Sequence, residues 1–325
     1  MDECKKIIIN TLNEFSIIYL IYAEEFMSEF QKYIFSIVLN SNLNIKKYRY
    51  NSITEFSGIL DKLKKDLPLK KKVNIIYFKP IIDIDVKQGK IFHSWLLDCF
   101  CNDIYVLYVE TLVNERVINY KDQIAILEFK AGREVFKSVK KYNEMLLQAL
   151  NTAKKLRIIS ETGVDISFEF DRKDIYTEAF DIYNEKITQF PGGEVFLLPH
   201  CETVNGIIVQ VVNNNKFVIK VKNGVADLTD CKKFINRTKD LLVEVGFGTN
   251  PAIPSIPTLD LYEKKLGTCH FGFGDSLLLN GSNKDDHHFD IVVPEFKMIL
   301  DDSVLFQFRS DDFETKPYRE NNTLL

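Results

Sequence analysis

Histidine is scarce in this sequence of 325 residues, and several features that mark particular classes of protein are missing. Lysine and arginine are interspersed with aspartate and glutamate at a net charge of −4, so there is no basic surface of the kind that neutralises nucleic-acid phosphates. No glycine-rich phosphate loop follows any predicted strand of the first half. We therefore expect neither a nucleic acid nor a nucleotide as a partner.

The N-terminal segment also lacks the marks of export. Asp2 and Glu3 stand where a secretory signal peptide would be basic, and the longest apolar run there is far shorter than the roughly 20 residues that cross a bilayer. The six cysteines form no CxxC pair and no regular framework, which is typical of reduced thiols. We expect a cytoplasmic protein that does not associate with a membrane.

Glycine is scarce in the first half of the chain, which indicates a change of architecture near the middle. The length allows two domains, and the composition, 46% apolar and 27% charged, is that of a folded protein. We predict an N-terminal domain over residues 1–155 and a second domain over residues 156–325. Before residue 166 the sequence has four of its 14 glycines, namely Gly58, Gly89, Gly132 and Gly163.

In the first half of the chain, short apolar runs typical of strands alternate with segments whose apolar residues have helical spacing. The β-rich runs VNIIYF (73–78), DIYVLYV (103–109) and QIAILEF (123–129) predict strands. Residues 134–155 place apolar side chains at helical spacing and predict a helix. This alternation predicts an α/β domain.

The second half consists of short apolar runs separated by glycine, asparagine and proline. Runs such as DISFEF, EVFLLP, GIIVQVV and DIVVPEF are typical of strands joined by turns. They predict a mainly antiparallel β domain, either a curved sheet or a barrel. Residues 231–242, CKKFINRTKDLL, are the helical exception that we expect there.

Three of the five histidines lie between residues 267 and 293. In the predicted strand HHFDIVV, alternation directs His288 and Asp290 to one face and His287 to the other. In GTCHFGFGD, His270 shares a face with two glycines, which leaves room for an ion or a substrate. A single His-x-Asp pair is more often a surface or hydrogen-bonded feature, but imidazole with carboxylate is also a common ligand set for zinc, cobalt, manganese or iron. His93 and His200 have no such neighbours, and we interpret both as structural.

Three glutamates stand at unusual places in the second half. Glu244 lies inside the apolar run LLVEVGFGTNP, where a carboxylate needs a cation or hydrogen-bond donors to offset its desolvation. Glu194 follows a PGG turn and opens the strand EVFLLP, and Glu263 opens EKKLGTCH. Glu194 and Glu263 are equally compatible with ordinary surface positions.

The segments GEVFLLP, EVGFGTNP, EKKLGTCHFGFGD and HHFDIVV, in this order, resemble the aminopeptidase T family of metallo-aminopeptidases, in particular its shorter members. LRIISETGVDISF also resembles the opening of the metal-binding domain in that family, and the resemblance covers roughly residues 156–309. It implies that residues 156–325 are a metal-binding catalytic domain with two divalent ions, zinc, cobalt or manganese. Position by position, the implied ligands are Glu194, Glu244, Glu263, His270, His288 and Asp290.

A related group on the same scaffold is the 2,5-dihydroxypyridine dioxygenases, which hold one iron. Those enzymes differ from the peptidases at the positions of Glu194, Glu244 and His270, where this sequence keeps the peptidase residues. Longer peptidases carry a tyrosine seven residues after the GTxH histidine, where this chain has Leu277, so any role of that tyrosine is absent here. The comparison favours two metal ions over a single iron.

The resemblance implies a homodimeric enzyme that acts on a peptide or small amide with a free N-terminus. Glu263, or failing that Glu244, is the implied general base. Two alternatives stay open: an Fe(II) ring-cleaving dioxygenase with His270, His288 and Asp290 as ligands, and a tailoring enzyme dedicated to one pathway. A binding module without catalysis is the least favoured interpretation.

Overall fold

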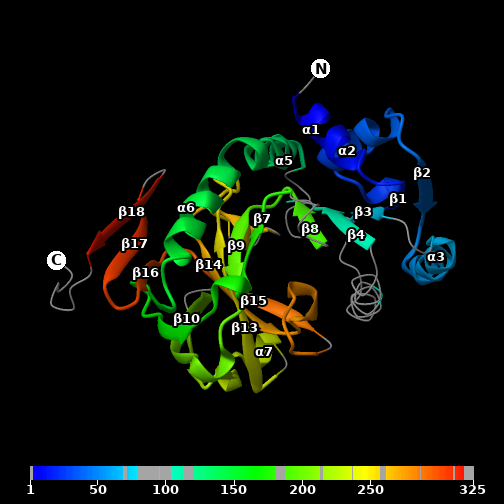
Figure 1. Ribbon diagram of the computed structural model, residues 1–325. Helices are drawn as coiled ribbons and strands as arrows, with labels where there is room; N and C mark the ends of the chain where they lie inside the picture. The colour runs from blue at the N-terminus through cyan, green and yellow to red at the C-terminus, as the bar shows by residue number, and fades with distance from the viewer. Residues whose placement is uncertain are drawn as a thin grey trace. The chain divides into compact units, whose positions relative to one another are not determined.

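The computed structural model describes residues 3–68, 72–79, 95, 104–110, 112, 121–180, 187–212, 215–235, 237–256, 261–285, 287–309 and 312–317. The chain forms two compact units, each assembled from several segments (Figure 1). The first unit comprises Met1–Lys137, Glu178–Gly192 and Ala252–Tyr262, and the second comprises Ser138–Thr177, Gly193–Pro251 and Glu263–Leu325.

The first unit is built on a five-stranded parallel sheet with the order β2-β1-β3-β4-β8. All six side chains of β3 are buried, as expected for a central strand that is covered on both faces. The strands predicted at 73–78 and 103–109 are therefore confirmed as β3 and β4. The strands are β1 Ile17–Tyr22, β2 Ile45–Arg49, β3 Val73–Phe78, β4 Ile104–Val109 and β8 Ile187–Phe190.

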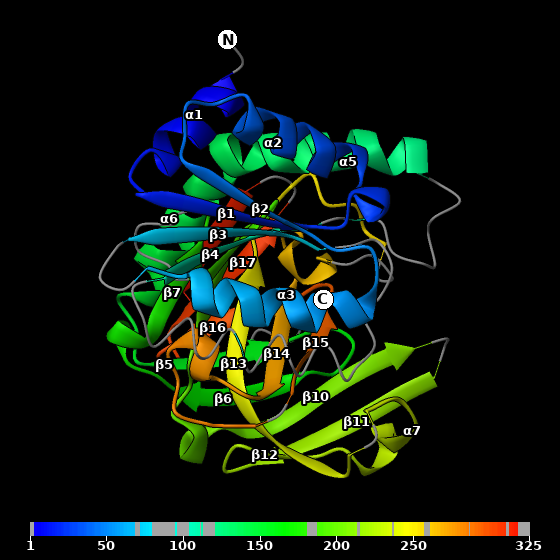
Figure 2. The same cartoon turned by 90° about the vertical axis from the view of Figure 1, so that its right-hand side faces the viewer.

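Helices cover both faces of this sheet, with α3 on the opposite side of the strands from α1, α2 and α5 (Figure 2). Ser28 begins α2 through a capping box with Gln31, and the side chain of Ser52 caps α3. Phe30 of α2 contacts Phe129 of α5, with ring centroids 5.5 Å apart. The helices are α1 Glu3–Leu12, α2 Glu29–Leu39, α3 Ile53–Asp66 and α5 Lys121–Glu134.

The prediction of a strand at residues 123–129 is wrong, because these residues lie inside α5. The buried positions Glu128, Ala131, Gly132 and Val135 recur at spacings of three and four, which is the helical period. A short apolar run such as QIAILEF does not by itself distinguish a strand from a buried helix. The helix predicted over residues 134–155 is present as the π turn Val135–Val139 and α6 Lys140–Leu150.

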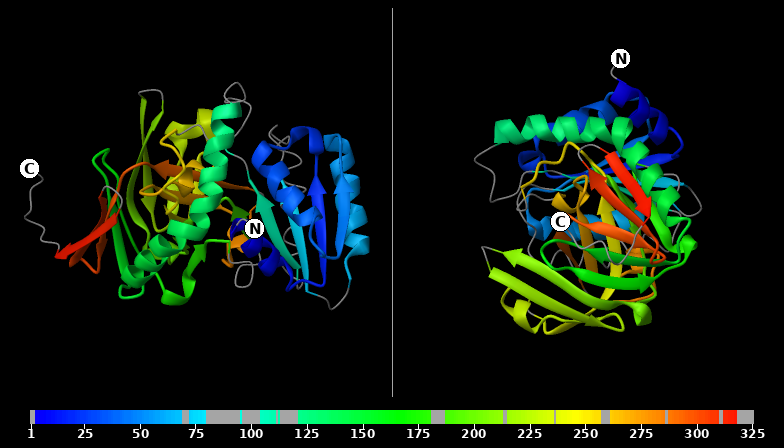
Figure 3. Two further views of the ribbon diagram at one scale, coloured as in Figure 1. Left: turned by 90° about the horizontal axis from the view of Figure 1, so that it is seen from above. Right: turned by 90° about the vertical axis from the view of Figure 1, so that its left-hand side faces the viewer.

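The second unit contains a large antiparallel sheet with the order β15-β14-β13-β12-β11-β10-β6-β5-β16-β17-β18, and β9 pairs with both β13 and β7. The described strands form an open sheet and do not close into a barrel, so the curved-sheet form of the prediction holds. Figure 3 shows the long β10–β11 hairpin in yellow-green and β16 to β18 in orange and red. The strands are β5 Lys155–Ile159, β6 Asp165–Glu169, β7 Ile175–Glu178, β9 Glu194–Leu197, β10 Asn205–Val212, β11 Asn215–Lys222, β12 Val225–Asp227, β13 Lys239–Gly248, β14 Cys269–Gly274, β15 His288–Val293, β16 Lys297–Leu300, β17 Val304–Arg309 and β18 Asp312–Pro317.

The helix predicted over residues 231–242 is present only at its start, as α7 Lys232–Ile235. Strand β13 begins at Lys239, because the residues from there on pair with β12 and β14, and from Leu242 onward all of them are buried. The fold class, an α/β part and a mainly antiparallel β part, is confirmed. The division into residues 1–155 and 156–325 stays a prediction. Strand β8, Ile187–Phe190, pairs with β4 in the parallel sheet of the first unit. Asn143 of α6 belongs to the second unit, where it donates a hydrogen bond to the carbonyl oxygen of Glu194.

Within the described residues, no helix combines the length and the apolar character that crossing a membrane requires.

Candidate metal centre

Four neighbouring strands of the second unit, β9, β13, β14 and β15, carry five of the six predicted ligands on one face. Gly272 of β14 lies between Glu244 of β13 and Asp290 of β15. His270 of β14 lies opposite Gly246 of β13. Since side chains alternate along a strand, the opposite face is apolar, and it is buried in the core. The polar face presents Glu194, Glu244, His270, His288 and Asp290.

The first group of potential ligands comprises Glu194, Glu244 and His270, all of them buried. Nε2 of His270 lies 3.4 Å from Oε2 of Glu194 and 3.5 Å from Oε1 of Glu244. Oε2 of Glu194 and Nδ1 of His270 are buried and have no hydrogen-bond partner among the described residues. Buried polar atoms without a partner are rare in proteins, and a cation beside Oε2 of Glu194 would satisfy that oxygen.

The second group comprises Glu244, His288 and Asp290. Nε2 of His288 lies 3.1 Å from Oε2 of Glu244 and 3.4 Å from Oδ1 of Asp290. Nδ1 of His288 donates a hydrogen bond to the carbonyl oxygen of Asp275 at 2.7 Å, so Nε2, on the side of the carboxylates, is the nitrogen that can bind a metal ion once it is deprotonated. Glu244 therefore belongs to both groups, with one oxygen toward each histidine.

The spacing of these atoms suits metal ligands. Two ligand atoms at about 2.0–2.1 Å from a zinc ion and at tetrahedral angles are roughly 3.3 Å apart. The four distances between histidine nitrogens and carboxylate oxygens range from 3.1 to 3.5 Å. Imidazole with carboxylate is also a donor set of zinc, cobalt, manganese and iron. The residues present therefore fit divalent metal ions.

Two glycines make room for the ligand side chains themselves. A Cβ atom at Gly246 would lie 2.1 Å from Cε1 of His270, and one at Gly272 would lie 2.9 Å from both Oε2 of Glu244 and Cε1 of His288. The sequence indicated open space beside His270 for an ion or a substrate. The structure shows instead that Glu244 and His288 fill the space at Gly272, and that His287 fills the space at Gly274, the second glycine on the face of His270.

The side chains of the two groups perturb one another's pKa values. Burial lowers the pKa of His270, but a hydrogen bond with Glu244 and the charge of Glu194 outweigh this and raise the pKa to about 9. Burial also lowers the pKa of His288, but Asp290 and Glu244 outweigh it and hold the pKa well above its ordinary value. Burial raises the pKa of Glu244, yet the two histidines hold it far below its usual range. A metal ion that binds here must displace protons from the histidines.

Lys264 is a member of the site that the sequence did not reveal. Its side chain is 8% exposed, and its ammonium group forms an ion pair with Oε1 of Glu194. It ends the 3-10 turn Tyr262–Lys264, which directs its side chain into the protein. A lysine within the charged run EKK is typical of a solvated surface. The alternation of side chains between two faces holds for strands and not for turns, so nothing in the sequence indicated this contact.

Glu263 precedes Lys264 and is half-buried, but it belongs to neither ligand group. Burial raises the pKa of its carboxyl group, and the charge of Lys264 offsets part of that rise. Its carbonyl oxygen accepts a hydrogen bond from Oγ1 of Thr268 at 2.8 Å. The predicted roles of Glu263 as ligand and general base stay predictions.

His287 joins a separate group of charged side chains. Its Nδ1 lies 2.6 Å from Oδ1 of Asp285, and its Nε2 lies 2.6 Å from Oδ2 of Asp240. Nη2 of Arg237 lies 3.2 Å from Oδ1 of Asp285. These contacts hold the segment that leads into β15, immediately before His288.

His200 belongs to neither of the two ligand groups. Nε2 of His200 lies 3.5 Å from Oδ2 of Asp171, and with Asp174 these side chains are close enough to hold an ion, so the structural interpretation of His200 stays a prediction. His93 lies outside the described residues.

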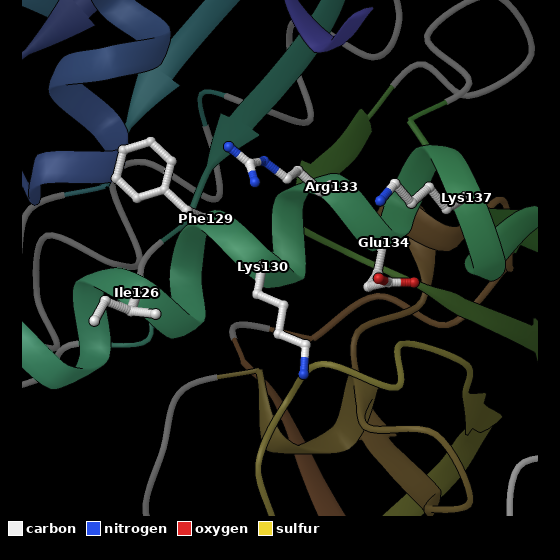
Figure 4. A pocket seen from close by; sticks show the side chains of 6 residues that line it. All are labelled: Ile126, Phe129, Lys130, Arg133, Glu134 and Lys137. Atoms are coloured by element: carbon white, nitrogen blue, oxygen red, sulfur yellow. The ribbon is translucent and has the colours of Figure 1, made fainter.

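A cavity of about 480 Å³ in the first unit runs along α5 and the π turn (Figure 4). None of the predicted ligands lines it. Its walls are Ile126, Phe129, Lys130, Arg133, Glu134 and Lys137.

The fold of this chain is similar to the folds of two solved enzymes. No protein-family model matches the sequence, and no curated protein matches it either. The structure of 2,5-dihydroxypyridine dioxygenase from Pseudomonas putida is similar, with a TM-score of 0.61, 12% identity, and coverage of 92% of this chain and 93% of that chain. Wild-type AmpT, aminopeptidase T, from Thermus thermophilus is similar with a TM-score of 0.56, 12% identity, and coverage of 97% of both chains. The predicted resemblance to both proteins is confirmed at the level of the fold.

Proposed function

We propose that this chain is a metal-dependent, aminopeptidase-like hydrolase that cleaves a peptide or amide bond next to a free N-terminus. The observation that carries the proposal is the position of Glu244, which has one carboxylate oxygen 3.5 Å from His270 and the other 3.1 Å from His288. A carboxylate shared by two ligand groups suits two divalent ions, and the ions of two-metal hydrolases are about 3.5–4 Å apart. The likeness of the fold to AmpT supports the same interpretation.

In this proposal Glu194, Glu244 and His270 would hold one ion, and Glu244, His288 and Asp290 would hold the other. Zinc, cobalt or manganese ions at these positions would supply Lewis-acid chemistry and lower the pKa of a water molecule. Because Glu263 lies outside both groups, its carboxylate stays available to take the proton of the attacking water and return it to the leaving amine. Glu244 is the second choice for that role. A carboxylate of the site would bind the free amino group of the substrate.

We further propose a cytoplasmic homodimer, as the resemblance to the peptidase family implies. Cys201, Cys231 and Cys269 are free thiols, which suits a reducing compartment.

A mononuclear Fe(II) dioxygenase is the second candidate, because the other similar structure is such an enzyme by its name. It would use His270, His288 and Asp290 as ligands. In the described residues, however, these three do not form one ligand group: Glu244 lies between the two histidines and belongs to both groups. A third candidate, an enzyme of this scaffold that modifies one dedicated peptide or amide, predicts full metal binding without activity on generic dipeptides.

The test compares amide hydrolysis by the wild-type chain and by Glu244→Gln, both loaded with zinc, cobalt or manganese. We expect the wild-type enzyme to hydrolyse aminoacyl p-nitroanilides but not their N-acetylated forms. We expect Glu244→Gln to lose roughly 100-fold or more of the rate while its fold is intact, since an amide has one coordinating oxygen and cannot serve both ions. Glu169→Gln, at an exposed position of β6, is the matched control and should be fully active.

A fully active Glu244→Gln variant would show that Glu244 is not part of the catalytic metal site. Oxygen uptake with a hydroxylated ring substrate, and no hydrolysis with any free-amine substrate, would favour the dioxygenase.

A further inference from the structure

The two ligand groups differ in how far their side chains are arranged for a metal ion. In the second group, the hydrogen bond from Nδ1 of His288 to the carbonyl of Asp275 fixes the ring and its tautomer. In the first group, Nδ1 of His270 is buried without a hydrogen-bond partner among the described residues, so no such bond selects a tautomer. The side chains of the second group are therefore better oriented for binding a metal ion than those of the first.

The two groups also differ in charge. Lys264 forms an ion pair with Oε1 of Glu194, and both side chains are less than a tenth exposed. Glu194 thus already neutralises one cation before any metal ion arrives. Within the part of the chain that the structure describes, the carboxylate of Asp290 forms no ion pair with a lysine or arginine.

We propose that Lys264 is an internal cation that competes with a metal ion for Glu194, so that the two metal positions fill in a fixed order. The position formed by Glu244, His288 and Asp290 fills first and tightly. The position formed by Glu194, Glu244 and His270 fills second and weakly, because the ammonium group shares the charge of Glu194 and repels a second cation in a buried site of low dielectric constant. This inference rests on the proposed pair of metal positions, and it assigns Lys264 a positioning role.

The test is a titration of the metal-free, full-length protein with Zn²⁺, followed by native mass spectrometry and isothermal calorimetry. We expect the wild-type chain to bind two ions in two steps whose dissociation constants differ by at least about tenfold. Lys264→Met should tighten the second step by about tenfold or more and leave the first unchanged. Lys265→Met is the matched control, because Lys265 is half-buried and donates a hydrogen bond to the carbonyl of Leu266 at 3.1 Å, away from Glu194.

The order of filling is tested independently of Lys264→Met, should that variant fail to fold. Asp290→Asn should remove the tight step, and Glu194→Gln should remove the weak step. Two equal steps in the wild-type chain, or loss of the tight step in Glu194→Gln, would overturn the inference while leaving the two-metal hydrolase intact. Absence of any zinc binding in all of these proteins would overturn the proposed function together with the inference.

Discussion

The substitution Gly246→Ala tests the geometry of the site without touching a ligand. Gly246 lies in the middle of β13, opposite His270, and its backbone φ is not in the left-handed region. The strand conformation therefore accepts alanine, and the new methyl group is the whole perturbation. That methyl carbon would lie 2.1 Å from Cε1 and 2.2 Å from Nε2 of His270.

The magnitude follows from the packing around this ring. To restore an ordinary contact of about 3.4 Å, the imidazole would have to move by about 1.3 Å. His270 is 1% exposed, so the ring has no open space to enter. Overpacking of this kind costs about 1–3 kcal/mol of unfolding free energy, which corresponds to a fall in Tm of roughly 2–12 °C for a unit of this size. A ligand displaced by more than 1 Å should also weaken zinc binding at the Glu194–Glu244–His270 position by about 10- to 100-fold.

The assay is thermal unfolding of the metal-free protein together with a zinc titration. Gly58→Ala is the matched control: Gly58 is exposed inside α3, and a Cβ atom there meets nothing within 4 Å. It should stabilise the protein by about 0.4–1 kcal/mol, since alanine is the better helix former. A Gly246→Ala variant with wild-type stability and two wild-type zinc affinities would refute the placement of His270.

Two further predictions concern the histidines. In the metal-free protein the pKa of His270 is raised to about 9. Its contribution to the free energy of unfolding is therefore fully present below its unfolded pKa of about 6.5 and is lost as the pH rises through about 9. Urea unfolding in the presence of a chelator should show this fall in stability, and a stability that does not change with pH would contradict it. His287→Gln cannot span both carboxylates that the ring contacts, Asp240 and Asp285, and should weaken zinc binding at the neighbouring His288 several-fold while leaving the zinc stoichiometry unchanged, as measured by calorimetry.

The parts of the fold and site that depend on alternation could be predicted from the sequence. His288 and Asp290 share a face, and His287 takes the other, because strand periodicity alone decides this. Glu244 could be predicted because a carboxylate inside an apolar run must meet a cation or a donor. The four ordered motifs that carry these residues also indicated the scaffold, which the solved structures confirm.

The parts that depend on turns and on distant contacts could not be predicted. Lys264 enters the site from a 3-10 turn, where no periodicity tells which of several charged side chains points inward. The support of His288 comes from a main-chain carbonyl, that of Asp275, and any residue type presents such a group. Residues 123–129 of α5 were misassigned to a strand because the run QIAILEF is shorter than the window in which a helical period becomes visible.

The central claim is that Glu244 is shared by two metal ions, and the metal content per chain tests it most directly. Tag-free protein purified without oxygen would be analysed by native mass spectrometry, as isolated and at saturation with zinc, cobalt or manganese. We predict saturation at two ions per chain in the wild-type protein. Saturation at one ion per chain, with iron as the metal in the isolated protein, would contradict it and place the dioxygenase first.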